Sequence, residues 1–161
     1  MQRKFGRFGY FLFRGERSKS RGISISKKEF PVSRRAFEKM VKEAIESIPP
    51  EMKERLENVA FLVRKNPSDL PDDWEEEDQG LLGLYHGISR KDRGVSYGNV
   101  LPDRIVIYQK PLEKISSNLE ELKENIRQTV IHEVGHYFGF DEDELRELEE
   151  EGFQIQQGDE P

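Results

Sequence analysis

The amino-acid sequence predicts one small domain that combines helices with strands. Three observations lead to this prediction. The chain has only 161 residues, which favours a single hydrophobic core. Three segments are short, apolar and rich in β-branched residues, as strands are. Two longer segments repeat apolar residues every three or four positions, as amphipathic helices do.

The first predicted helix follows Ser33, a residue type that commonly caps helix N-termini. Pro49 and Pro50 should end this helix, because proline has no backbone N–H to donate. The next residues, 51–56, are compatible with one further helical turn. Apolar residues recur at helical spacing and should form the buried face: Phe37, Val41, Ala44, Ile45 and Ile48.

Three strands are expected after this helix. They cover residues 57–65 (ENVAFLVRK), 81–87 (LLGLYHG) and 104–110 (RIVIYQK). The first two are separated by the acidic run DDWEEED, which we expect to be a solvated loop. Pro111 should close the third strand.

A long helix is predicted over residues 119–138. Asn118 is the expected N-cap, with Glu121 three residues later in a capping-box pattern. Gly139 stands where a left-handed residue commonly ends a helix. A last, strongly acidic helix is expected over residues 141–151, with Leu145 and Leu148 as its apolar anchors.

Charge divides the chain into a basic arm and an acidic body. Residues 1–28 carry a net charge of +8, so the rest of this chain of net charge −6 carries −14. Aromatic residues interleave with the basic ones, and such an arm could bind nucleic acid or another acidic partner. We favour a poorly ordered extension or an extra edge strand. The predicted organisation is therefore an arm (1–28), one domain (29–152) and a tail (153–161).

Several classes of protein are excluded by composition. No stretch approaches the ~20 apolar residues of a transmembrane helix, so no membrane association is expected. The apolar stretch at residues 9–13 is too short for a signal peptide. The chain has no cysteine, which excludes disulfides and thiolate metal sites and fits a reducing compartment. We therefore expect a cytoplasmic protein.

The most informative motif is HEVGH at residues 132–136. Residues four apart lie on one face of a helix, with Cβ atoms ~5–6 Å apart, so His132 and His136 can reach one ion. Glu133 is rotated by about 100° from His132 and lies beside that face. This is the position of a general base that takes a proton from metal-bound water.

A catalytic zinc site usually needs a third protein ligand. In the extended pattern HExxHxxGxxH the third ligand stands three residues after the glycine, which here is Glu142. Asp143 and then Asp141 are the alternatives, and the acids of this segment could instead form a solvated cluster at a helix N-terminus. The third histidine, His86, could donate to a transition state, but we favour a structural or exposed role.

The sequence resembles the small bacterial zincin-like proteins, described as having a minimal zincin or matrix-metalloprotease-like fold. The stretches LLGLYHGISR, YGNVLPDRIVIYQKPL and VIHEVGHYFGFDEDELRELE carry this resemblance, which runs from about Phe37 to Glu149. It implies an α+β fold in which a short mixed sheet packs on the HExxH helix. It also implies zinc held by His132, His136 and the acid at Glu142, with Glu133 as the base.

Our leading functional hypothesis is a zinc-dependent metallopeptidase that acts on peptides or proteins. In it, strand 104–110 offers its edge to an extended substrate peptide. The alternative is a non-catalytic or vestigial zincin-fold module with a binding or regulatory role, since so small a domain leaves few residues for a substrate cleft.

Overall fold

The computed structural model describes the part of the chain in which the predicted helices and strands lie. The basic arm, the acidic run DDWEEED and the tail, and with them the predicted domain boundaries, fall outside the described residues. The described residues are 31–67, 81–95, 97–98 and 100–150.

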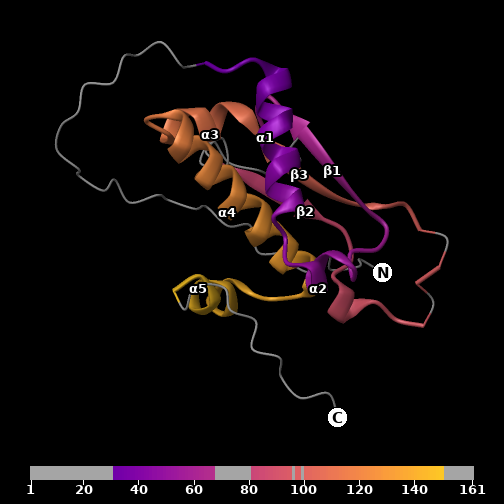
Figure 1. The fold of residues 1–161 in the computed structure, drawn as a ribbon. Helices are drawn as coiled ribbons and strands as arrows, with labels where there is room; N and C mark the ends of the chain where they lie inside the picture. The colour runs from indigo at the N-terminus through magenta and orange to yellow at the C-terminus, as the bar shows by residue number, and fades with distance from the viewer. Residues whose placement is uncertain (1–30, 68–80, 96, 99, 151–161) are drawn as a thin grey trace.

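Three strands form one mixed sheet (Figure 1). They are β1 (Val59–Arg64), β2 (Gly83–His86) and β3 (Asp103–Tyr108), in the spatial order β1-β3-β2. β3 runs parallel to β1 and antiparallel to β2. The predicted α+β fold with a short mixed sheet is confirmed. The expectation that the third strand offers an edge is wrong, because β3 is paired on both sides.

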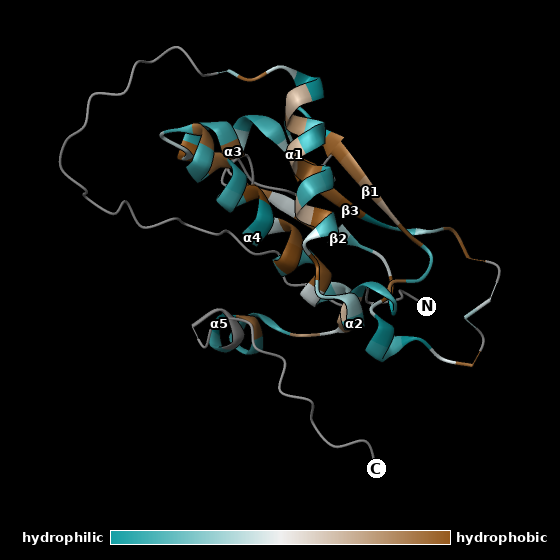
Figure 2. Cartoon of the chain, in the orientation of Figure 1, coloured by the Kyte–Doolittle hydropathy of each residue, from teal (hydrophilic) through white to brown (hydrophobic). Residues whose placement is uncertain are grey.

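Two helices cover one face of this sheet. α1 (Arg34–Glu46) packs against α4 (Leu119–Phe138), and α4 also contacts β2 and β3 (Figure 1). The hydrophobic core lies between these layers, and its centre is formed by side chains that are at most 3% exposed: Phe37, Val41, Ile105, Ile107, Leu122, Ile126, Val130 and Val134. β1 is largely hydrophobic, as Figure 2 shows.

The helix ends follow the predicted capping residues. The Ser33 side chain accepts a hydrogen bond from the backbone N–H of Ala36, and the Asn118 side chain accepts one from Glu121 (2.9 Å). The Glu121 carboxylate in turn accepts from the N–H of Ser117 rather than from that of Asn118. Gly139 ends α4 with φ of 98°, a left-handed conformation that glycine adopts without steric cost.

Two short helices differ from the sequence-based expectation. Pro50 begins α2 (Pro50–Lys53) instead of only ending the helix before it, since a proline is tolerated where no N–H partner is needed. Pro111 likewise lies in the first turn of α3 (Gln109–Ile115), a helix that we did not predict. The first four N–H groups of a helix have no partner within it, so proline fits there. The last helix, α5, spans Glu142–Glu150.

A buried polar cluster ties the segment between β2 and β3, which includes the 3-10 turn η2 (Arg90–Asp92), to the rest of the domain. Arg93 pairs with Asp103 at 2.8 Å, and both side chains are less than 10% exposed. Asp103 also accepts from the Tyr85 hydroxyl (2.6 Å), and the Arg93 guanidinium lies 4.8 Å from the centroid of the Tyr137 ring. A buried charge is stable when it is paired and hydrogen-bonded in this way.

In the part of the chain that the structure describes, no helix combines the length and the hydropathy needed to span a membrane.

Candidate metal centre

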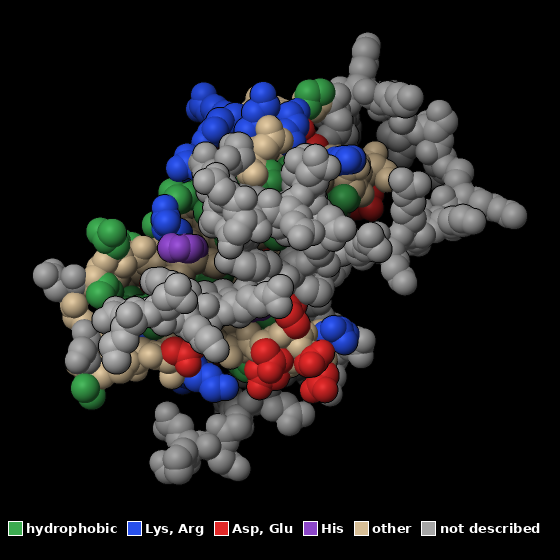
Figure 3. Space-filling model, turned by 180° about the vertical axis from the view of Figure 1, so that it is seen from behind, with side chains coloured by type: hydrophobic (Ala, Val, Ile, Leu, Met, Phe, Trp, Pro, Cys, Tyr) green, Lys and Arg blue, Asp and Glu red, His purple; other side chains and the backbone are tan. Residues whose placement is uncertain are grey.

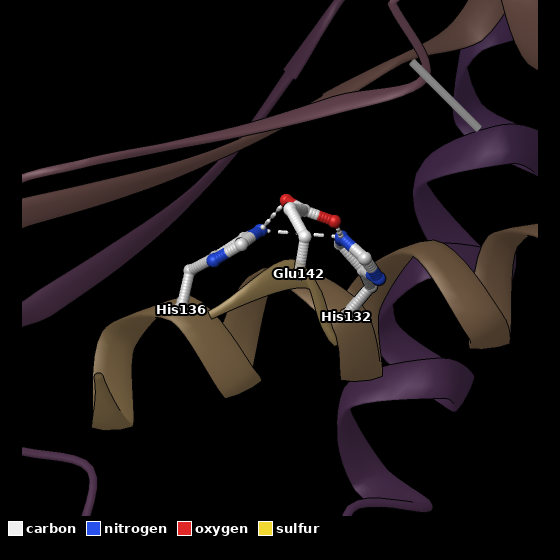
Figure 4. Close-up of side chains that lie close together, drawn as sticks. All are labelled: His132, His136 and Glu142. Atoms are coloured by element: carbon white, nitrogen blue, oxygen red, sulfur yellow. Dashed lines mark hydrogen bonds and ion pairs between the residues drawn. The ribbon is translucent and has the colours of Figure 1, made fainter. Parts of the chain in front are cut away.

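His132 and His136 project from the last two turns of α4 toward the same point (Figure 4). Their Nε2 atoms are 3.2 Å apart. Two nitrogens that each bind one tetrahedral ion at ~2.0–2.1 Å would lie about 3.3 Å apart. The spacing of the two rings therefore suits a shared ion.

Glu142 completes the group from the other side. It is the first residue of α5, and its carboxylate oxygens lie 2.9 Å from Nε2 of His136 and 3.5 Å from Nε2 of His132 (Figure 4). One potential ligand atom from each of the three residues lies within 4.8 Å of the others.

The two neighbouring acids point elsewhere. Asp141 accepts a hydrogen bond from the N–H of Glu144 (2.9 Å), and the Glu144 side chain accepts one from the N–H of Asp141 (2.8 Å). This reciprocal pair is a capping box, and it uses Asp141 to begin α5. The Asp143 side chain is 85% exposed and pairs with Arg146. Of the three acids considered, the structure thus brings only Glu142 to the histidines.

His136 is oriented by the turn that follows α4. Its Nδ1 lies 3.2 Å from the carbonyl oxygen of Phe140. A carbonyl oxygen can only accept, so Nδ1 carries the proton of the neutral ring and Nε2 is left with a lone pair. In metal-binding histidines, the ring nitrogen that does not bind the metal commonly donates to a backbone carbonyl, as Nδ1 does here.

The carboxylate of Glu142 is left without a hydrogen bond of good geometry. Both of its oxygens are buried and unsatisfied within the described residues. Acceptor atoms this close to one another repel unless a proton or a metal cation lies between them. Although burial alone would raise the pKa of Glu142, contact with the two imidazoles in their protonated form lowers it to about 2. The donor set of two imidazoles and one carboxylate also fits zinc.

Glu133 lies next to this group beneath β2. Its side chain is buried, and the backbone N–H of Tyr85 donates a hydrogen bond to its carboxylate. Burial raises the pKa of Glu133, while the nearby histidines and the Tyr85 N–H oppose that shift. Gly83 allows the close approach of the strand, because a Cβ there would lie 2.6 Å from Thr129 and 3.0 Å from Glu133.

His86 is exposed at the end of β2 and takes no part in the group. Gly83 faces Thr129 and Glu133 of α4, and side chains alternate along a strand, so His86 lies on the opposite face of the sheet. Its Nδ1 is 3.4 Å from the guanidinium of Arg104.

Electrostatics around the group favour a cation. Figure 3 shows Asp and Glu side chains gathered at the lower end of the molecule, where α5 lies in Figure 1, with some Lys and Arg side chains beside them, and a larger group of Lys and Arg side chains at the upper end. Clustered charge of one sign raises the local concentration of the opposite ion.

Sequence reasoning missed two features of this site. The first is the hydrogen bond from Tyr85, which depends on strand order and has no local signal. The second is the close packing at Gly83, for which the glycine within an apolar strand was the available signal.

The fold and the site together define a class of protein. A mixed sheet over an HExxH helix, with an acidic residue brought to the two histidines, is the arrangement of a zincin. A family model described as zincin-like metallopeptidase matches residues 56–152, more than half of the chain. The chain belongs to this zincin-like metallopeptidase family. Among curated proteins, none matches the sequence.

Proposed function

We propose that this chain is a zinc-dependent peptidase in which His132, His136 and Glu142 bind the metal. The observation that carries the proposal is the convergence of these three side chains, with potential ligand atoms within 4.8 Å of one another, beside the buried Glu133. Three protein ligands leave a fourth position open, as catalytic zinc sites require. Membership of a metallopeptidase family supports peptides as the substrate class.

Zinc at this site would polarise the scissile carbonyl and lower the pKa of a bound water. Glu133 has the properties of the general base in this reaction. It takes a proton from the attacking water and later gives that proton to the leaving amine, so water is added across the C–N bond. The raised pKa of Glu133 suits both steps, because a carboxyl of raised pKa holds the proton more readily after taking it.

The substrate peptide would bind along β2. Among the described residues no strand pairs with the outer edge of β2, and this strand passes directly over Glu133 at Gly83 and Tyr85. A peptide that adds to this edge as an extended strand would have its backbone beside the base.

The test compares hydrolysis and zinc content in two variants of the full chain. Glu133→Gln should retain stoichiometric zinc but lower the hydrolysis of a fluorogenic peptide mixture by ~10²–10⁴-fold, because the amide cannot accept the proton. His136→Ala should lose both zinc and hydrolysis.

Undiminished hydrolysis by Glu133→Gln would refute the general-base role. Wild-type protein that binds zinc at these residues but cleaves none of the peptides would favour the alternative, a binding or regulatory module with a vestigial site.

A further inference from the structure

The glycine inside the HEVGH motif lies against α5. A Cβ atom added at Gly135 would be 2.3 Å from Cδ2 and 3.4 Å from Cγ of Leu145. Leu145 is fully buried. At 2.3 Å the added Cβ and Cδ2 of Leu145 would overlap, so a larger residue at position 135 requires Leu145 of α5 to shift away from α4.

The position of α5 decides where Glu142 lies. Leu145 is three residues after Glu142, so the two side chains lie on the same face of α5, one turn apart. The N–H of Leu145 donates to the carbonyl of Asp141 (2.9 Å), which makes this turn a rigid unit. A displacement of Leu145 therefore carries the Glu142 carboxylate with it.

The connection between the two helices is also anchored at Gly135. Its carbonyl accepts hydrogen bonds from the N–H groups of both Gly139 and Phe140, each at 3.1 Å. The carbonyl of Gly135 thus anchors the turn, and the absence of a side chain at this position lets α5 pack closely against α4.

We propose that Gly135 is a positioning residue for the third metal ligand: by letting Leu145 pack directly on the backbone of α4, it places Glu142 within reach of His132 and His136. This inference rests on the proposed function, since it takes those three residues to be the ligands. Gly135 touches neither substrate nor metal in this scheme and acts through Glu142.

The experiment measures zinc affinity of the metal-free full chain by competition with a chromophoric chelator. Wild type, Gly135→Ala, Glu142→Ala and the double variant are compared. Gly135→Ala should weaken zinc binding by ~10–100-fold, the range expected when a ligand loses its support. In the Glu142→Ala background the same substitution should change the affinity by less than about twofold, because no third ligand remains to be displaced.

Thermal unfolding of the metal-free proteins provides the structural control. Alanine is a better helix former than glycine, so Gly135→Ala would not lower the unfolding temperature if its Cβ met no clash. Equal zinc affinity of Gly135→Ala and wild type would overturn the inference. Equal loss of affinity with and without Glu142 would also overturn it, because the effect would then be general to the fold.

Leu145→Ala tests the contact from the other side and serves if Gly135→Ala does not fold. It removes the atoms that a Cβ at position 135 would meet, and it also loosens α5, so zinc affinity should fall only when Glu142 is present. Unchanged affinity in Leu145→Ala would contradict the inference.

The outcome for the proposed function is separate. Absence of zinc binding by the wild type, or binding that His136→Ala leaves intact, would contradict the metal centre itself. Zinc binding that depends on His136 but is indifferent to Gly135 and Leu145 would contradict only the positioning role.

Discussion

α4 and α5 supply the three candidate ligands, but the domain holds these two helices in different ways. α4 is 20 residues long and packs on α1 and two strands, with a stripe of fully buried side chains from Leu122 to Val134. Within α5 the structure describes the side chains of residues 142–147, and of these Leu145 alone is buried. Two ligands are therefore fixed by the core, whereas the third depends on one packing contact and one capped turn.

The largest expected difference between the helices is in global stability. Ile126→Ala leaves a cavity in the core and should lower the free energy of unfolding of the domain by ~2–5 kcal/mol. Leu145→Ala should cost less, because α5 can detach while the sheet, α1 and α4 remain folded. Urea unfolding followed by far-ultraviolet circular dichroism measures both. Equal losses in the two variants would show that α5 belongs to the same cooperative unit as α4.

The second difference concerns pH in the metal-free protein. The folded-state pKa of Glu142, about 2, is below its unfolded value of 4.5, so ionised Glu142 stabilises the fold above pH 4.5 and loses that effect as the pH falls to about 2. Glu142→Gln should therefore cost on the order of 1 kcal/mol near pH ~5, after screening by solvent, and nothing below pH ~2.

A matched carboxylate on α4 gives the control for this pH effect. Glu124 has a lowered pKa because Arg127 donates hydrogen bonds to it, but its side chain is 48% exposed. Glu124→Gln should change stability by only a few tenths of a kcal/mol, as exposed i, i+3 pairs do. A loss of stability as large as that of Glu142→Gln would mean that contact with the two imidazoles stabilises the fold no more than an exposed ion pair does.

The last comparison concerns the two helix caps, whose losses should differ in how far they spread through the domain. Asn118→Ala and Asp141→Ala each remove one side-chain acceptor from a helix N-terminus, a change that costs ~0.5–2 kcal/mol. Asn118→Ala should lower global stability, because α4 cannot fray without opening the core. Asp141→Ala should instead speed amide hydrogen exchange within α5 alone. Faster exchange throughout the domain in Asp141→Ala would contradict the expectation that α5 opens independently of the core.

Features set by neighbouring residues were predictable from the sequence. The caps at Ser33, Asn118 and Gly139 and the common face of His132 and His136 follow from local geometry, and the structure has each of them. Helix α3 is not predictable in this way, because a proline after an apolar strand segment can either end the strand or lie in the first turn of a helix.

Features set by contacts between distant residues were not predictable in the same way. The prediction of a free edge on the third strand is wrong because the sequence of a strand does not reveal its place in the sheet. The choice among Asp141, Glu142 and Asp143 depends on how the turn after Gly139 directs each side chain, and the sequence could only rank them. No local sequence pattern predicts that Arg93 is buried against Asp103.

Tyr137 has a consequence for how this domain behaves among other copies of itself. Its hydroxyl accepts from the N–H of Glu57 (2.8 Å) and donates to the carbonyl of the same residue (3.0 Å), the two bonds that a neighbouring strand would make just before β1. Near the other end of β1, Arg34 donates to the carbonyl of Val63. Side chains thus occupy backbone groups near both ends of the outer side of β1 that could otherwise pair with the edge strand of another chain.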